Sequence, residues 1–182
     1  MGGHLREVGD QITPFDGLDR QFDHPRSPAR RRWKKGGEDH AIGRSRGGLS
    51  TKINVLVDEN GLPVRLMLTA CQAHDLRAAP QLLEGLKCCH VVTDRGYDAD
   101  ALLALIRVSG AKAHIPSTRQ RVVHRSVDPR IYRQRNLVER FFCKLKHFRR
   151  VATRFDKLAR NFLATVSLAS TQLWTRVYES IT

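Results

Sequence analysis

Hydrophobic residues recur with a helical period in the stretch Ile131–Arg150, and this pattern predicts one helix of about five and a half turns. One side of that helix gathers the apolar residues Leu137, Val138, Phe141, Leu145 and Phe148. A second side carries Glu139 in line with Tyr132, Arg135 and Lys146. The pattern therefore predicts a half-buried helix that presents one carboxylate among cations.

Strand patterns precede this helix. Ser50–Asp58 and Leu62–Thr69 have strand character, and Glu59-Asn60-Gly61 between them predicts a hairpin turn. Short buried strands are predicted at Lys87–Thr93 and Ala111–Pro116. Further helices are predicted at Ala78–Leu86, at Asp98–Val108 and at residues 159–178, where Phe162, Val166, Ala169 and Leu173 form an apolar stripe. This order of elements predicts a mixed α/β sheet flanked by helices.

Residues 1–40 show neither a helical period nor a strand alternation. Pro14, Pro25 and Pro28 interrupt the segment, and Arg30–Arg32 add positive charge. We expect residues 1–40 to be irregular or disordered, and residues 41–178 to form the folded domain. A flexible basic arm that contacts DNA phosphates is the functional alternative for this segment.

The charge balance predicts a polyanionic partner, because the formal net charge is +14 and the sequence pI is about 10.5. Residues 119–160 hold fourteen Lys or Arg against three acids. No apolar run approaches the roughly 18 residues of a membrane span, and no signal peptide is evident, so we expect a cytoplasmic protein without membrane contact. The four cysteines lack CxxC spacing, which argues against zinc and a disulfide framework.

Two acids stand where chemistry is expected, although each also has a structural interpretation. Asp94 follows a buried strand, where α/β sheets place functional groups, but it could simply cap the next helix, as could Asp98 or Asp100. Glu139 could be a metal ligand or could only pair with Arg135 on a solvated helix. His74-Asp75 is more typical of a helix cap, provided by Asp75, than of a catalytic pair.

The spacing of Tyr132, Arg135, Glu139 and Lys146 resembles the Tyr-Arg-Glu-Lys signature of bacterial insertion-sequence transposases. The text RNLVERFFCKLKHFRRVATRFDKLARNFLA, the VVTDRGYDAD around Asp94 and the GRSRGG at residues 43–48 are similar to the insertion-sequence-five family of DDE transposases. The resemblance covers about Lys34–Arg176. It implies an RNase H-like fold that acts on the terminal repeats and target DNA in the nucleoid, and it allows a homo-oligomer on DNA.

The resemblance also assigns residues. It implies that Asp94 and Glu139 are two of three catalytic acids and metal ligands, and that the cofactor is a pair of Mg²⁺ ions, which prefer carboxylate oxygens. Contacts with DNA are expected from cationic and aromatic side chains, namely Arg44, Arg46, Tyr132, Arg135, Lys146, Arg149 and Arg150.

The first acid of the family is not found. The resemblance requires an Asp-Ser-Thr motif on a central strand before GRSRGG, and none of Asp10, Asp16, Asp19, Asp23 and Asp39 lies in a credible buried strand. We therefore expect the sheet to lack its first strand and the chain to be inactive alone. Pro25–Trp33 can be encoded by a DNA whose +1 reading gives Arg-Ala-His-Gln-His-Ala-Ala-Gly, which looks like the family sequence just after the first acid. We therefore expect the residues before about Lys34 to be read out of frame. A non-catalytic DNA-binding remnant and an RNase H-like nuclease are the alternatives.

Overall fold

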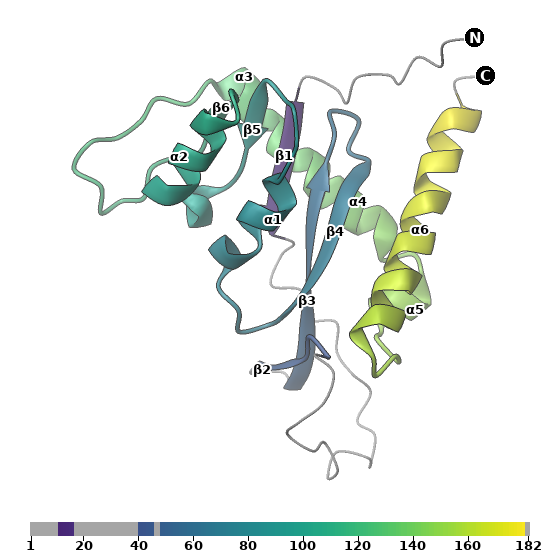
Figure 1. Ribbon diagram of the computed structural model, residues 1–182. Coiled ribbons are helices and arrows are strands. Elements are labelled where there is room, and N and C mark those ends of the chain that lie inside the picture. Colours follow the sequence, from purple (N-terminus) through teal and green to yellow (C-terminus); the bar gives the residue numbers. More distant parts are fainter. Residues whose placement is uncertain (1–10, 17–39, 46–47, 181–182) are drawn as a thin grey trace.

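The computed structural model describes residues 11–16, 40–45 and 48–180. Its backbone forms a mixed sheet in the order β2-β3-β1-β5-β6, and β4 pairs with β3 (Figure 1). The strands are β1 (Gln11–Asp16), β2 (Gly43–Ser45), β3 (Gly48–Val57), β4 (Pro63–Ala70), β5 (His90–Val92) and β6 (Lys112–His114). The pairs among β1, β2, β3 and β4 are antiparallel, whereas β1, β5 and β6 run parallel. The expected mixed α/β architecture is confirmed and is compatible with an RNase H-like fold.

The central position of the sheet is occupied by β1, so the prediction that the first central strand is absent is wrong. Thr13 pairs with Val57 of β3 on one side, and Ile12 pairs with Val91 of β5 on the other. Sequence patterning did not reveal this strand because it is six residues long and contains Pro14, which lacks an amide donor. Its hydrogen-bond partners are distant in the sequence, and local periodicity carries no information about them.

The predicted hairpin is confirmed. β3 and β4 pair from Thr51↔Ala70 to Val57↔Pro63, and Gly61 adopts φ +74° in the turn. The Asp58 carboxylate closes this turn, since its Oδ1 accepts hydrogen bonds from the amides of Asn60 at 2.9 Å and Leu62 at 2.8 Å. The hairpin thereby forms a rigid antiparallel half of the sheet.

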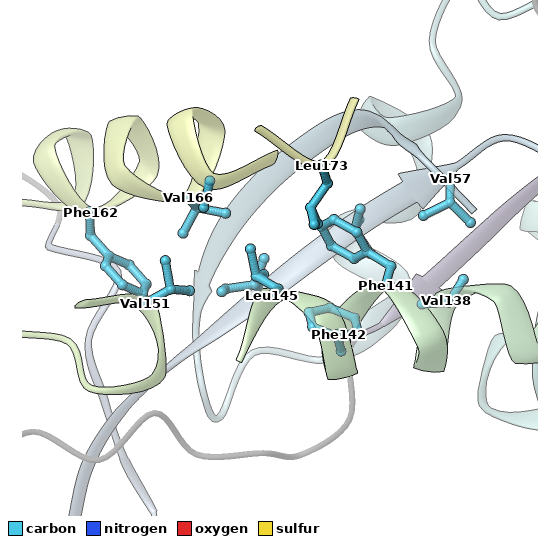
Figure 2. Packing of buried hydrophobic residues seen from close by; sticks show 12 residues of the cluster. Val57, Val138, Phe141, Phe142, Leu145, Val151, Phe162, Val166 and Leu173 are labelled. Carbon is cyan, nitrogen blue, oxygen red and sulfur yellow. The ribbon is translucent and has the colours of Figure 1, made fainter. Parts of the chain in front are cut away.

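Helices cover both faces of the sheet (Figure 1). One face packs against α4 (Asn136–Leu145), α5 (Arg149–Ala152) and α6 (Ala159–Glu179), and the other against α1 (Ala79–Leu83) and α2 (Asp100–Val108). Alternation along β3 links the two cores, because Val55 and Val57 belong to the first cluster and Leu56 to the second. Figure 2 shows the first core, in which Phe141 of α4 lies between Leu173 and Val57, and Leu145 of α4 lies between Phe141 and Val166 of α6.

The single long helix predicted at residues 131–150 is wrong in its length. The chain forms α3 (Pro129–Tyr132), the 3-10 turn η4 (Arg133–Arg135) and α4, and it leaves the helix before Phe148, whose backbone is extended (φ −82°, ψ 101°). The interruption lets Phe148 contact the first core from a separate element. Phe142 is buried as well, although the predicted apolar side did not include it.

The other helices follow the predictions more closely. The C-terminal helix is confirmed as α6, and its four predicted stripe residues are all buried. The helix predicted at Ala78–Leu86 is shorter, because α1 ends at Leu83 and Gly85 takes φ +67°. His74 rather than Asp75 caps the 3-10 turn η2 (Asp75–Arg77), since its Nδ1 accepts from the Leu76 amide at 3.3 Å. Asp75 instead forms an ion pair with Lys52.

A buried arginine connects the ends of several segments. Arg154 is 0% exposed, and its guanidinium donates to the carbonyl oxygens of His40, Asp156 and Lys157 and to the Thr51 hydroxyl. It also lies 4.9 Å from the centre of the Phe162 ring. Burial lowers the pKa of Arg154 to about 10, against an opposing effect of Asp156, so the group stays charged at neutral pH. Among the described residues, the acceptors of this charge are carbonyl and hydroxyl oxygens.

No helix in the described part of the chain is both long and apolar enough to span a lipid bilayer.

A histidine pair on β5 and β6 predicts a pH-dependent stability. His90 Nδ1 lies 3.0 Å from His114 Nε2, and His114 is only 3% exposed. Burial, with the positive charges of His90 and Lys112, lowers the pKa of His114, while Asp128 opposes this shift. Because the folded-state pKa lies below the unfolded value of about 6.5, stability is complete above that pH and is lost as pH falls toward the folded-state pKa.

We expect the melting temperature to decrease between pH 7.5 and pH 5.5, and the decrease to be smaller in His114→Asn. Thermal unfolding at both pH values measures this difference. The exposed His124 provides the control, because His124→Asn should keep the full pH dependence. An unchanged pH dependence in His114→Asn would contradict the assignment.

Candidate functional site

Asp94 lies two residues after the end of β5, at the C-terminal edge of the parallel strands, as the sequence predicted. Its Oδ1 accepts a hydrogen bond from the Gly96 amide at 2.8 Å, and it caps the 3-10 turn η3 (Arg95–Tyr97). Gly96 allows this close approach, because a Cβ atom there would lie 3.1 Å from Asp94 Oδ1. The capping interpretation of Asp94 thus holds for η3, whereas α2 begins after Ala99 and has no side-chain cap.

The topology brings a second acid-bearing strand end to the same edge. β1 and β5 are parallel neighbours, and their register, continued past Val92, brings Phe15 level with Asp94. Asp16 is the last residue of β1, and Asp94 follows β5, so the two residues lie at the same end of adjacent strands. Of the N-terminal acids that the sequence analysis placed outside any credible buried strand, Asp16 is the last residue of β1. Asp10, Asp19, Asp23 and Asp39 lie outside the described residues.

Glu139 stands on α4, the helix that packs over β1 and β3. Its Oε1 accepts a hydrogen bond from Arg135 Nη2 at 3.0 Å, and about a third of each side chain is exposed. The pairing interpretation of Glu139 is thus correct, and it also fixes the carboxylate on the exposed side of a helix whose opposite side is buried. A partly exposed ion pair of this kind adds little stability.

The remaining residues of the signature lie on three consecutive elements. Tyr132 ends α3, Arg135 belongs to η4, and Lys146 follows the last residue of α4. Their backbones stay in the right-handed helical region, which keeps the side chains close to the predicted stripe. Of these residues, Arg135 has a contact with Glu139 that the structure defines.

The other predicted DNA contacts lie apart from this stripe. Arg149 and Arg150 are exposed on α5, beyond the end of α4. Arg44 is exposed on β2, and Arg46 lies outside the described residues. On either side of residues 46–47, which lie outside the described residues, β2 pairs with β3, with Gly43 opposite Ser50 and Ser45 opposite Gly48.

The donor set of the described residues does not match a complete two-metal site. Asp94 and Glu139 offer the hard carboxylate oxygens that Mg²⁺ prefers. However, no group of three His, Cys, Asp or Glu side chains gathers in the part of the chain whose side chains are placed. One oxygen of each acid is also engaged by a protein donor, Gly96 or Arg135. Two acids of this kind hold two ions poorly.

A charge cluster beside Asp94 escaped the sequence analysis. The Asp98 carboxylate is 0% exposed and accepts hydrogen bonds from the Thr118 amide at 2.6 Å, from Arg121 Nε at 2.9 Å and from Arg125 Nη2. Burial alone would raise the pKa of Asp98, but these hydrogen bonds and the charge of Arg125 outweigh it and lower that pKa. Asp98 was considered only as a helix cap, and that interpretation is wrong. The signal for its role was the excess of arginine in the loop after β6.

Comparison with known proteins identifies the class to which this arrangement belongs. Residues 9–174 match the family described as "Transposase DDE domain", so the match includes β1, Asp94 and Glu139. The similarity thus extends further upstream than the sequence resemblance at Lys34 predicted. The chain is 39% identical over 130 residues to "Putative transposase for insertion sequence element IS6501" of Brucella ovis, an alignment that covers 70% of this chain and all of the relative. The protein therefore belongs to the DDE-domain family of insertion-sequence transposases.

Proposed function

We propose that this chain is the catalytic part of an insertion-sequence transposase and that Asp94 and Glu139 are two of its catalytic acids. The observation that carries the proposal is the placement of Asp94 after β5, within a sheet edge shared with β1, in a chain that matches the family over residues 9–174. Family membership implies DNA binding and a divalent metal ion in general, and we propose Mg²⁺. When bound, such ions activate an oxygen nucleophile and stabilise the leaving 3′ oxygen.

The chain's own residues supply binding and orientation. Arg135 holds Glu139 through the hydrogen bond to Oε1, and Gly96 holds Asp94 through Oδ1, so each carboxylate has a fixed direction. Tyr132 and Lys146 lie along the same side of the helical stretch, where stacking and a phosphate contact are the roles we propose. Arg149 and Arg150 on α5 are exposed, and further phosphate contacts are the role we propose for them.

We further propose that the site is incomplete. β1 occupies the central strand but reads Gln-Ile-Thr-Pro-Phe-Asp, with no Asp-Ser-Thr motif, and its single acid is the last residue of the strand. Without a bridging first acid, two carboxylates hold a metal pair weakly. This combination supports a chain that binds DNA and does not transfer strands by itself.

The test is a strand-transfer assay with the purified chain, Mg²⁺ and a duplex that carries the element's terminal repeat. We expect no transfer product, together with measurable binding of the same duplex. Isothermal titration with Mn²⁺ as the probe should show weak binding that Asp94→Asn and Glu139→Gln each reduce further. Efficient strand transfer by the chain alone would contradict the proposal that the site is incomplete. Unchanged Mn²⁺ binding in both variants would overturn the two acids as ligands.

DNA binding should be strongly salt-dependent, because residues 119–160 carry fourteen cations against three acids. We expect affinity for a random duplex to fall about 10³-fold or more between 50 and 200 mM salt if six or more phosphates are contacted. Arg149→Gln should lower the slope of log K against log salt by about 1. Fluorescence anisotropy measures both quantities.

The control for this titration is Arg176→Gln, which removes one exposed charge near the end of α6, outside residues 119–160. It should leave the slope nearly unchanged. A binding constant that is flat between low and moderate salt would contradict the proposed interface.

Two alternatives remain testable in the same assays. A DNA-binding remnant would bind the duplex, but Asp94→Asn would not change its binding of Mn²⁺. An RNase H-like nuclease would hydrolyse the substrate without joining the cut 3′ end to target DNA. The match to the transposase family favours strand transfer over hydrolysis.

A further inference from the structure

The loop between β6 and α3 is fastened to the turn that carries Asp94. This basic loop, residues 117–128, projects from the body beside α2 and β6 (Figure 1). Near the start of the loop, the Thr118 amide donates a hydrogen bond to the Asp98 carboxylate, and further along the Arg125 guanidinium donates to the same carboxylate. The backbone amide of Arg125 also donates to Ser117 Oγ at 2.9 Å. Asp98 is itself tied to η3, since its amide donates to the Arg95 carbonyl. Three donors of the loop therefore meet on the Asp98 carboxylate, four residues after Asp94.

These contacts with Asp98 determine which groups face solvent. Arg121 and Arg125 turn inward onto Asp98, and Arg121 Nη2 also reaches Asp100 at 2.6 Å. Arg119 and His124 remain exposed on either side of Val122 and Val123. These valines are 98% and 77% exposed, which places an adjacent apolar pair between two groups that can contact phosphates.

We propose that Asp98 is a positioning residue that holds this basic loop against DNA next to Asp94. The inference rests on the proposed DNA-binding function and assigns a second contact element besides α4 and α5. Arg119 contacts a phosphate, and the valine pair contacts sugar or base surface beside it. Asp98 does not touch DNA, because its carboxylate is covered by its three donors. DNA is favoured over an acidic protein because the loop begins the stretch of residues 119–160, in which fourteen cations stand against three acids, in a chain of a DNA transposase family.

Asp98→Asn distinguishes a positioning role from a purely electrostatic one, because the two roles predict different changes in DNA affinity. Asp98→Asn removes a negative charge, so electrostatics alone would strengthen DNA binding or leave it unchanged. An asparagine side chain at this position would, however, present an amide donor to groups that are themselves donors, and the loop would lose its anchor. Positioning therefore predicts weaker binding, by roughly tenfold, for a short duplex in anisotropy titrations.

Asp100→Asn is the matched control, because Asp100 contacts the same Arg121 but its side chain is 83% exposed. It should bind DNA as well as the native chain or better. Arg125→Lys conserves charge and removes the forked guanidinium, so it should also weaken binding, whereas Arg119→Lys should not. If Asp98→Asn does not fold, the comparison of Arg125→Lys with Arg119→Lys tests the positioning role instead.

Hydrogen exchange adds a readout that does not depend on DNA. The amides of Thr118 and Arg125 should exchange faster in Asp98→Asn than in Asp100→Asn, while the β3 amides stay protected. If the unmodified chain binds DNA and both Asp98→Asn and Arg125→Lys bind it with the same affinity, the positioning role is wrong. Absence of DNA binding by the native chain would instead overturn the proposed function on which this inference rests.

Discussion

Arg154→Met is expected to lower the free energy of unfolding by about 3–5 kcal/mol, the cost of breaking a buried charged network from one side. The substitution leaves three carbonyl oxygens and the Thr51 hydroxyl without their donor, and each unsatisfied buried group costs about 1–3 kcal/mol before relaxation. Since a domain of this size is stable by only about 5–15 kcal/mol, the variant should be marginal. Urea denaturation followed by circular dichroism measures the change.

Two further variants give this prediction its controls. Arg154→Lys keeps the charge but cannot reach all four acceptors, so it should also destabilise the chain. Arg176→Met removes an exposed arginine from α6 and should change stability by less than about 0.5 kcal/mol. If Arg154→Met were as stable as Arg176→Met, the guanidinium would not connect residue 40, β3 and the loop before α6 in solution.

Restoring the first acid is expected to raise strand transfer by at least about 100-fold, because each 1.36 kcal/mol of transition-state stabilisation gives a factor of ten and a bound metal supplies several kcal/mol. The variant is a chain in which the codons before Lys34 are read in the +1 frame, so that an acid-bearing strand precedes Arg-Ala-His-Gln-His-Ala-Ala-Gly. Transfer of a labelled terminal-repeat end into target DNA measures the gain. Sequencing the locus establishes whether that frame encodes the strand.

Glu139→Gln in the frame-corrected chain should abolish the gained activity while leaving duplex binding intact. Asp16→Asn in the 182-residue chain tests the competing explanation that Asp16 is the third catalytic acid. If the unmodified chain transferred strands and lost that activity in Asp16→Asn, then Asp16 would be the third acid and the frame proposal would be wrong.

The sequence carried enough information to predict the parts of the fold whose partners are near in the chain. The β3–β4 hairpin follows from alternation around Gly61, and α6 follows from its apolar stripe. β1 could not be predicted in this way, because its pairing with Val57 and Val91 is long-range and Pro14 argues against a strand. The break at Phe148 was missed because the helical period continues through it, and tertiary packing overrides that period.

The same distinction between local and long-range contacts applies to the candidate site. Asp94 and Glu139 could be proposed from short motifs, since strand end and helix side are local properties. Asp98 could not, because its three donors come from residues twenty or more positions later and pair with it only after β6 has been placed. Residues whose role depends on distant partners are recognised by geometry rather than by spacing.

The six residues of β1 have a consequence for self-association. In the described part of the chain, β1 is the strand that joins antiparallel β3 to parallel β5. A molecule in which this segment detached would expose two unpaired strand edges at once, on Val55–Val57 and on His90–Val92. Open edges of this kind recruit a strand from another molecule. The gap between β3 and β5 would then be filled by intermolecular pairing, and the oligomeric state would depend on protein concentration.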